Sequence, residues 1–276
     1  LALRDGNYVN TERGKASASD PIEGLDALSF PDTIQGIVTS RIDRLPLQHQ
    51  MTLKVASVVG HHFSMDVVKH IHPMEQDRPL VPRHLEYLVE MGFLRVGRGK
   101  DIEGYMFAHA ITQEVAYELM LFDQRRQLHR GIALWYEEYS KESEVNNFPI
   151  LAHHWYEAGD LFQTTRYLEK SGDLAYSTGA FIEATQKYER SLELGGTKTE
   201  GEENHSVAEI KLRRARWNRK LADSLYGLGS MESALVHSRQ ALSLLGKRVP
   251  ATLVGWKLSN ARCRIAAPKY TGRVPK

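Results

Sequence analysis

Apolar positions in the first third of the chain recur at the spacing of one helix face. In the stretch SFPDTIQGIVTSRIDRLP, Asp32 and Gln35 stand at the spacing of a capping box, and Pro46 is expected to end the helix. Its inward stripe is predicted to comprise Ile34, Ile37, Val38, Ile42 and Leu45. Similar spacing predicts helices in QHQMTLKVASVV, SMDVVKHI and VPRHLEYLVEMG, the last ending at Gly92.

The pattern changes after Gly92. Two short apolar runs, Phe93–Val96 and Tyr105–Ala108, flank a Gly-rich polar loop, which is typical of a β-hairpin. Helical spacing returns at residues 111–121 and 124–140. Helices followed by a hairpin indicate a winged-helix plan for this part of the chain.

Beyond Pro149 the chain is predicted to be helical, and a short motif repeats within it. Tyr-x-x-Gly stands three times between two apolar-periodic helices, as Tyr156 with Gly159, Tyr176 with Gly179, and Tyr226 with Gly229. Ala184 and Ala234 follow the last two glycines at equal offsets, as do Leu192 and Leu242. Tetratricopeptide-type hairpins stack through such a small residue and a leucine two turns later. The repeat spacing is irregular, so a tetratricopeptide-like array is predicted rather than a regular one.

The predicted fold is therefore mainly α, with a winged-helix domain and its small β-hairpin followed by a tetratricopeptide-like α-hairpin array. Residues 1–29, rich in Gly, Ser, Asp and Asn, form an irregular leading segment in this interpretation. The winged-helix-like domain spans residues 30–145 and the array spans 146–246. A basic segment, 247–276, follows and is expected to be truncated. The start LALRDGNYVN, without methionine, likewise suggests a piece of a longer protein.

Composition places the chain in the ordinary folded class, since 42% of its 276 residues are hydrophobic and 25% are charged. A formal net charge of +2 does not require a nucleic acid or an anionic membrane as partner. Cys263 is the single cysteine, which excludes an intramolecular disulfide and fits a reducing compartment. No stretch has the length of a membrane span or the pattern of a secretory signal, so a cytoplasmic location is expected.

Catalytic motifs are absent from the sequence. GxxxxGK(S/T) does not occur, so we expect neither an enzyme nor a bound cofactor in this chain. The adjacent pairs His61 with His62 and His153 with His154 would point about 100° apart on a helix. No HExxH or comparable ligand set accompanies them. They are therefore interpreted as surface or packing histidines rather than metal ligands.

Two basic features bear on nucleic-acid binding. The run KLRRARWNRK, Lys211–Lys220, gathers six positive charges around Trp217, and a solvated helix face paired with neighbouring repeats is favoured for it. The helix that would enter a DNA groove, PRHLEYLVEMG, has Glu86 and Glu90 against one Arg83. Carboxylates repel DNA phosphates, so nucleic-acid binding is not expected.

A histidine at the end of the hairpin is the best candidate for a signalling contact. The stretch from Tyr105 to Ala133 has apolar residues at core spacing, while most of its charged residues point outward. His109 instead lies where the second strand turns into the next helix, a junction with free backbone N–H groups. A capping or packing histidine is the alternative interpretation.

Several linked motifs carry a resemblance to a known family. FPDTIQGIVTSRIDRLP, KVASVVGHHFSMDVV, LEYLVEMGFL, YMFAHAITQEVAYELML, RRQLHRGIALWYE and AHHWYEAGD resemble the region after the ATPase core in STAND-type signalling ATPases. The likeness covers about residues 30–245 and is strongest to proteins fused to class III adenylyl or guanylyl cyclases, such as the soluble adenylyl cyclases. It implies that residues 1–29 end an ATPase lid. ATP or ADP and Mg²⁺ are implied only for an upstream ATPase domain that this chain lacks.

The resemblance also implies a role for His109, since a winged-helix histidine in STAND ATPases contacts the bound nucleotide. The expected function is a non-catalytic regulatory and scaffold segment that couples nucleotide state and partner binding to an output domain. Its expected partners are the upstream ATPase domain and a protein bound by the repeats. Two alternatives stay open: a DNA-binding winged-helix transcription regulator and a plain tetratricopeptide adaptor.

Overall fold

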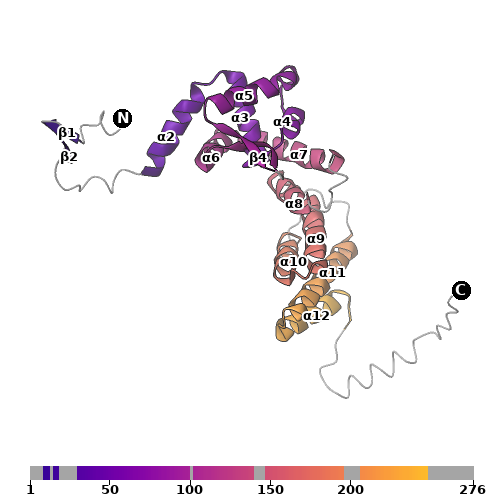
Figure 1. The fold of residues 1–276 in the computed structure, drawn as a ribbon. Helices are drawn as coiled ribbons and strands as arrows, with labels where there is room; N and C mark the ends of the chain where they lie inside the picture. The colour runs from indigo at the N-terminus through magenta and orange to yellow at the C-terminus, as the bar shows by residue number, and fades with distance from the viewer. Residues whose placement is uncertain are drawn as a thin grey trace, which may run out of the picture. The chain divides into compact units, whose positions relative to one another are not determined.

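The computed structural model is mainly helical (Figure 1). It describes residues 9–12, 15–18, 30–99, 102–139, 147–195 and 206–247. These residues form eleven α-helices and two small antiparallel sheets, so the predicted mainly α class is confirmed. The chain divides into two compact units, residues 1–120 and 121–276. Apart from Lys247, the predicted basic C-terminal segment lies outside the described residues.

The first unit contains the predicted helices and one additional 3₁₀ turn. They are α2 (Phe30–Asp43), α3 (Leu47–Val59), α4 (Met65–Ile71), η1 (Glu75–Leu80), α5 (Val81–Glu90) and α6 (Ala110–Glu118). Ser64 caps α4 by accepting the Val67 N–H on its Oγ. Gly92 ends α5 in the left-handed region at φ +75°, which favours glycine.

The first helix differs from its prediction in two respects. It begins at Phe30, so Asp32 lies inside the helix rather than at its N-cap. Ile34 and Ile37 are about half exposed, at 47% and 49%, whereas the rest of the predicted stripe is buried. Only the C-terminal half of α2 therefore packs within the described unit, and helical spacing alone does not reveal where the packing stops.

A three-stranded antiparallel sheet completes the unit, in the order β3-β5-β4. Its strands are β3 (His62–Phe63), β4 (Leu94–Gly99) and β5 (Ile102–Phe107). The predicted hairpin is thus confirmed, whereas β3 is too short for any periodicity to predict. Gly104 allows β3 and β5 to approach closely, because a Cβ there would collide with the Phe63 carbonyl oxygen.

A second, separate hairpin lies in the segment that was predicted to be irregular. Strands β1 (Val9–Glu12) and β2 (Lys15–Ala18) pair antiparallel, with Val9 opposite Ala18. The prediction for residues 1–29 was wrong at these positions. Four-residue strands of mixed polar composition leave too little alternation to detect.

The second unit is a succession of helices, each packed against the next along the chain (Figure 1). They are α7 (Phe122–Tyr139), α8 (Phe148–Glu157), α9 (Leu161–Ser177), α10 (Phe181–Leu194), α11 (Val207–Gly227) and α12 (Met231–Leu244). Trp155 and Tyr167 anchor one buried cluster, and Tyr188 and Leu221 anchor the next. Such a chain of neighbouring contacts builds an elongated core from local packing.

Two helix starts in this unit are fixed by side-chain caps. Asp160 Oδ1 accepts the Gln163 N–H at 2.9 Å and begins α9. Ser206 and Glu209 form a capping box at the start of α11. Within the described residues, no helix is both long and apolar enough to cross a membrane.

Candidate protein-interaction surface

The three Tyr-x-x-Gly motifs form the same turn between consecutive helices. Gly159, Gly179 and Gly229 each have φ +79°. Each glycine N–H donates to the carbonyl of the motif tyrosine at 2.9–3.1 Å, and the next N–H donates to the residue before that tyrosine at 2.8–3.0 Å. These two hydrogen bonds together form the Schellman motif, which ends a helix by satisfying its last carbonyl groups.

The glycines, not the tyrosines, determine these turns. Tyr156, Tyr176 and Tyr226 are 41%, 42% and 65% exposed. Gly246 forms the same turn at the end of α12 without any tyrosine, donating to the Ser243 carbonyl at 2.9 Å. The three tyrosines are therefore available at the surface of the array.

Small residues occupy buried positions at the predicted helix crossings. Ala184 and Ala234 are 0% and 7% exposed. Thr164 takes the place of alanine in the first hairpin, where its hydroxyl donates to the Asp160 carbonyl at 2.7 Å. The hydroxyl is thereby satisfied inside a close-packed crossing.

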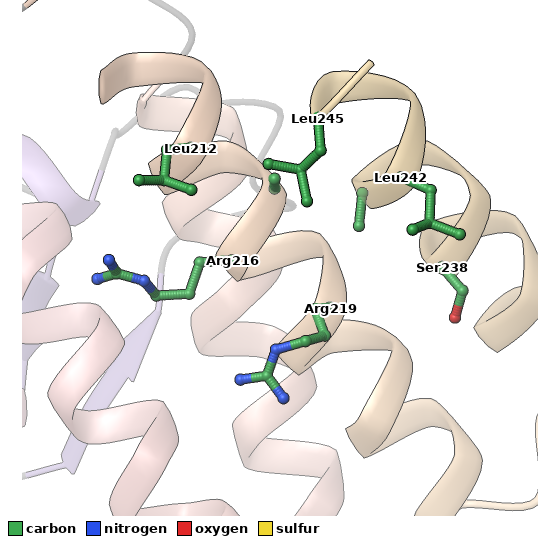
Figure 2. A pocket seen from close by; sticks show the side chains of 8 residues that line it. Leu212, Arg216, Arg219, Ser238, Leu242 and Leu245 are labelled. Atoms are coloured by element: carbon green, nitrogen blue, oxygen red, sulfur yellow. The ribbon is translucent and has the colours of Figure 1, made fainter. Parts of the chain in front are cut away.

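An apolar groove lies between α11 and α12 (Figure 2). Its volume is about 470 Å³, with Leu212 on one side and Leu242 and Leu245 on the other. These leucines are 51%, 39% and 48% exposed, respectively. Large apolar side chains gathered at a hollow surface are typical of an interaction site.

Cationic side chains border the groove. Arg216 and Arg219 line it from α11, and their side chains are 52% and 63% exposed. Arg219 pairs with Asp223 at 2.9 Å, and Arg216 lies 3.8 Å from Glu169. The Arg219–Asp223 pair is exposed on both sides and therefore weak, so Arg219 can pair with an acidic ligand instead. Arg216 is exposed on its own side of a contact to the largely buried Glu169.

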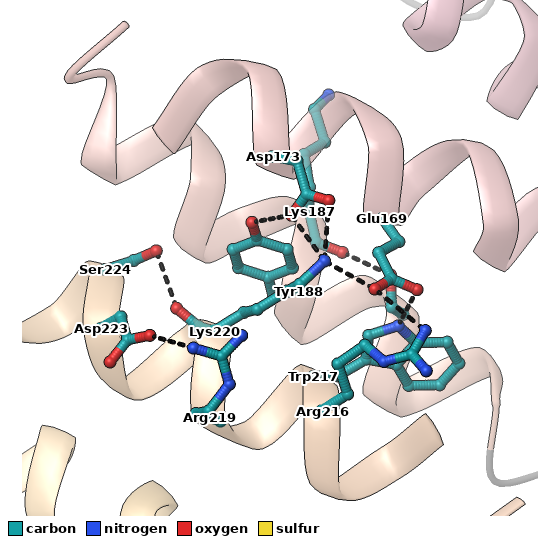
Figure 3. Close-up of polar contacts among 11 residues, drawn as sticks. Glu169, Asp173, Lys187, Tyr188, Arg216, Trp217, Arg219, Lys220, Asp223 and Ser224 are labelled. Atoms are coloured by element: carbon teal, nitrogen blue, oxygen red, sulfur yellow. Dashed lines mark hydrogen bonds and ion pairs between the residues drawn. The ribbon is translucent and has the colours of Figure 1, made fainter. Parts of the chain in front are cut away.

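Two residues of the basic run, Trp217 and Lys220, contact α9 inside the second unit (Figure 3). Lys220 Nζ lies 2.6 Å from Glu169 Oε1 and 2.7 Å from Asp173 on α9. Trp217 is fully buried and its Nε1–H donates to Glu169 Oε2 at 3.0 Å. This network pairs α11 with α9, and Trp217 and Lys220 lie largely buried rather than on the solvated face predicted for the run.

Tyr188 links α10 to the same network. Its hydroxyl donates to Asp173 Oδ1 at 2.7 Å (Figure 3). Burial and the bond to Asp173 both raise the pKa of Tyr188, so the hydroxyl remains a hydrogen-bond donor. Charged and polar contacts thus hold α9, α10 and α11 together.

His109 occupies the N-cap position of α6 with an extended backbone, φ −143° and ψ 136°. Its side chain is exposed and makes no capping hydrogen bond. His109 thus forms no side-chain cap in this structure, and its role in a signalling contact stays a prediction. The position leaves the imidazole available to another surface.

A histidine cluster that sequence reasoning missed lies between α7 and α8. His129 and His154 are both 2% exposed, and their Nδ1 atoms are 2.8 Å apart. His153 is exposed, and ligand atoms of all three histidines lie within 4.8 Å of one another. The adjacent pair His153 and His154 is visible in the sequence. Its partner His129 precedes His153 by 24 residues and lies on another helix, so no motif spacing indicates it.

Comparison with known proteins adds one distant relative. No family model and no solved structure matches the chain. The uncharacterized protein R02095 of Rhizobium meliloti (strain 1021) is 25% identical over 174 residues. The match covers 63% of this chain but 17% of that protein. The chain therefore corresponds to a small part of its relative.

Proposed function

We propose that this chain is a non-catalytic regulatory and scaffold segment that docks a protein partner through its helical array. The observation that carries the proposal is the apolar groove between α11 and α12 with arginines at its border. Leucines on an exposed hollow surface offer hydrophobic contact, and Arg216 and Arg219 add selectivity for negative charge. The partner we infer is an amphipathic helix with leucines on one face and acidic residues beside them.

The array architecture supports this function. Consecutive helices joined by three equivalent glycine turns agree with a tetratricopeptide-like interpretation. Arrays of this kind present extended surfaces for protein ligands, since each repeat contacts only its neighbours. The three equivalent turns leave Tyr156, Tyr176 and Tyr226 exposed, which fits a binding role for the surface.

A winged-helix interpretation of the first unit is also part of the proposal. The order α3, β3, α4, α5, β4, β5 with the sheet order β3-β5-β4 supports it. Glu86 and Glu90 are exposed on α5, the helix that would enter a DNA groove. Their charges oppose DNA phosphates, so a docking role is favoured over transcription regulation.

The link to a signalling ATPase rests on the family resemblance. In that proposal the winged helix docks against an upstream ATPase core in one of two states, biased by nucleotide and by the partner on the array. The exposed His109 would contact the core or its nucleotide in the closed state. A GxxxxGK(S/T) motif upstream of Leu1 in a longer protein would favour a signalling ATPase over a plain tetratricopeptide adaptor.

Fluorescence anisotropy with a labelled synthetic helix tests the groove. The peptide has leucines at i, i+3, i+4 and i+7 and glutamates elsewhere. We expect Leu242→Asp to weaken its binding about tenfold or more, a loss of about 1.4 kcal/mol. Leu47→Asp, which changes a 79% exposed leucine in the other unit, is the matched control and should leave binding unchanged.

The stability of the Leu242→Asp variant is the second readout. An open groove predicts a change in unfolding free energy within about 0.5 kcal/mol, as for other surface positions. A loss above about 2 kcal/mol would mean that the chain's own residues cover the groove. Either that loss or equal peptide affinity in both variants would overturn the proposed docking site.

A further inference from the structure

The histidine cluster of the second unit has the geometry of a ligand set. His129 projects from α7, and His153 and His154 project from α8, which packs against α7. The ring centroids of His129 and His154 are 5.1 Å apart, and His153 lies 5.8 Å and 5.1 Å from these two rings. Within the described residues, ligand atoms of the three side chains lie within 4.8 Å of one another, close enough to hold one ion.

Two of these imidazoles are held in the form that binds metals. The 2.8 Å contact requires an unprotonated Nδ1 on one ring, and burial of both rings disfavours a charge on the other. A neutral imidazole nitrogen is a common ligand for zinc and other first-row divalent ions. No proton therefore needs to leave an imidazolium at either position before an ion binds.

The short contact between the two buried rings shows where the ion would enter. One Nδ1 must donate a hydrogen to the other across the 2.8 Å contact. Tetrahedral zinc with Zn–N bonds of about 2.0 Å would separate two nitrogens by about 3.3 Å. An opening of roughly half an ångström would thus replace the shared hydrogen by a metal ion.

We propose that His129, His153 and His154 bind one Zn²⁺ ion, which joins α7 to α8 at the start of the helical array. The exposed His153 provides the entry side, and a water molecule would complete the tetrahedron there. Tyr136 lies nearly parallel to the His154 ring, at 14° and 6.4 Å, and helps to hold it in place. The charge of Arg125, one turn before His129, opposes a cation and limits the affinity.

Isothermal titration with ZnCl₂ tests this site on the 276-residue chain, expressed without a polyhistidine tag and dialysed against a chelator. The wild-type chain should bind one Zn²⁺ per molecule. His153→Gln should weaken binding about tenfold or more, since loss of an outer-shell partner alone costs roughly that factor. His153 is exposed, so this substitution does not disturb a buried position.

Three controls make the outcome specific. His62→Gln alters the other adjacent histidine pair, in the first unit, and should leave Zn²⁺ affinity unchanged. Leu242→Asp in the groove should also retain Zn²⁺, which separates this proposal from the proposed docking function. Zn²⁺ should raise the melting temperature of the wild-type chain more than that of His153→Gln, because ligand binding to the folded state stabilises it.

Two results would overturn the metal site. One is the absence of saturable Zn²⁺ binding by the wild-type chain, which would leave His129 and His154 as a structural hydrogen-bonded pair. The other is equal weakening by His153→Gln and His62→Gln, which would indicate surface binding at adjacent histidines.

Discussion

Lys220 reaches from α11 to α9, where its Nζ lies 2.6 Å from Oε1 of Glu169. The two side chains are 16% and 15% exposed, so the ion pair is largely removed from solvent. Glu169 also accepts the indole N–H of Trp217, which satisfies its second oxygen. A basic run that looks like solvated surface in the sequence therefore contains an internal cross-link between helices.

Lys220→Met should lower the free energy of unfolding of the second unit by about 2 to 3 kcal/mol, because it removes the nearer cation of the largely buried Glu169 and leaves it Arg216, at 3.8 Å. Urea unfolding followed by tryptophan fluorescence measures this unit specifically, since all four tryptophans lie beyond residue 120. Arg190→Met is the matched control. Arg190 and Glu193 form an exposed pair at 2.9 Å, whose loss should cost at most about 0.5 kcal/mol. Equal losses for the two variants would contradict the internal role of Lys220.

The glycine turns give a second prediction. Gly179→Val and Gly229→Val should each destabilise the second unit by roughly 1 to 3 kcal/mol, because a branched side chain resists φ +79°. No atom lies within 4 Å of the added Cβ at either site, so the cost arises from the backbone rather than from a clash. Urea unfolding measures the loss.

Ala180→Val is the control for these turns. It introduces the same side chain one residue later, at an exposed position with φ −78°, and should change stability by less than about 0.5 kcal/mol. Unchanged stability in both glycine variants would contradict the left-handed turns on which the repeat register depends.

Local features of the fold were predictable from the sequence, because they depend on neighbouring residues. Gly179 and Gly229 mark turns since the backbone conformation there excludes most side chains. Ala184 and Ala234 were predicted at helix crossings from their offsets to these glycines. The mainly α class followed from the same helical periodicity.

Features that depend on a partner distant in sequence were not predictable. Ile34 lies on the predicted apolar face of α2, yet no described element of its unit covers it. His129 and His154 meet because α7 packs against α8, and single-helix geometry suggested that adjacent histidines would diverge. Lys220 could not be told from the exposed cations of its run, since only the position of α9 distinguishes them.

The buried histidine pair predicts that acid destabilises the second unit. The pKa of His129 and His154 is about 3 in the folded chain, against about 6.5 when unfolded, so the unfolded state binds more protons between these values. This contribution to stability is complete above about pH 6.5 and is lost as pH falls toward 3. Each histidine contributes a slope of at most about 1.4 kcal/mol per pH unit in that window.

Urea unfolding followed by tryptophan fluorescence, at several pH values between 7.5 and 5 and with a chelator present, measures this slope. This pH range covers about one unit on either side of the histidine pKa in the unfolded chain, where the slope changes. His154→Gln removes one titrating group and should make the slope shallower. His62→Gln, which lies in the other unit, should leave it unchanged. A wild-type slope in His154→Gln would show that other groups control the acid response.

The exposure of His109 leads to the last prediction, which separates a signalling segment from an adaptor. His109 makes no capping bond and lies at the surface, so His109→Ala should change the melting temperature of this chain little. In a longer protein with an upstream ATPase core, the same substitution should remove one charge-assisted contact of roughly 1.5 to 3 kcal/mol from the closed state. Nucleotide retention should then fall about tenfold or more and basal output should rise. Two measurements on His109→Ala separate the two roles: nucleotide release from the longer protein and thermal melting of the 276-residue chain. A lower melting temperature with normal nucleotide retention would show that His109 makes no signalling contact.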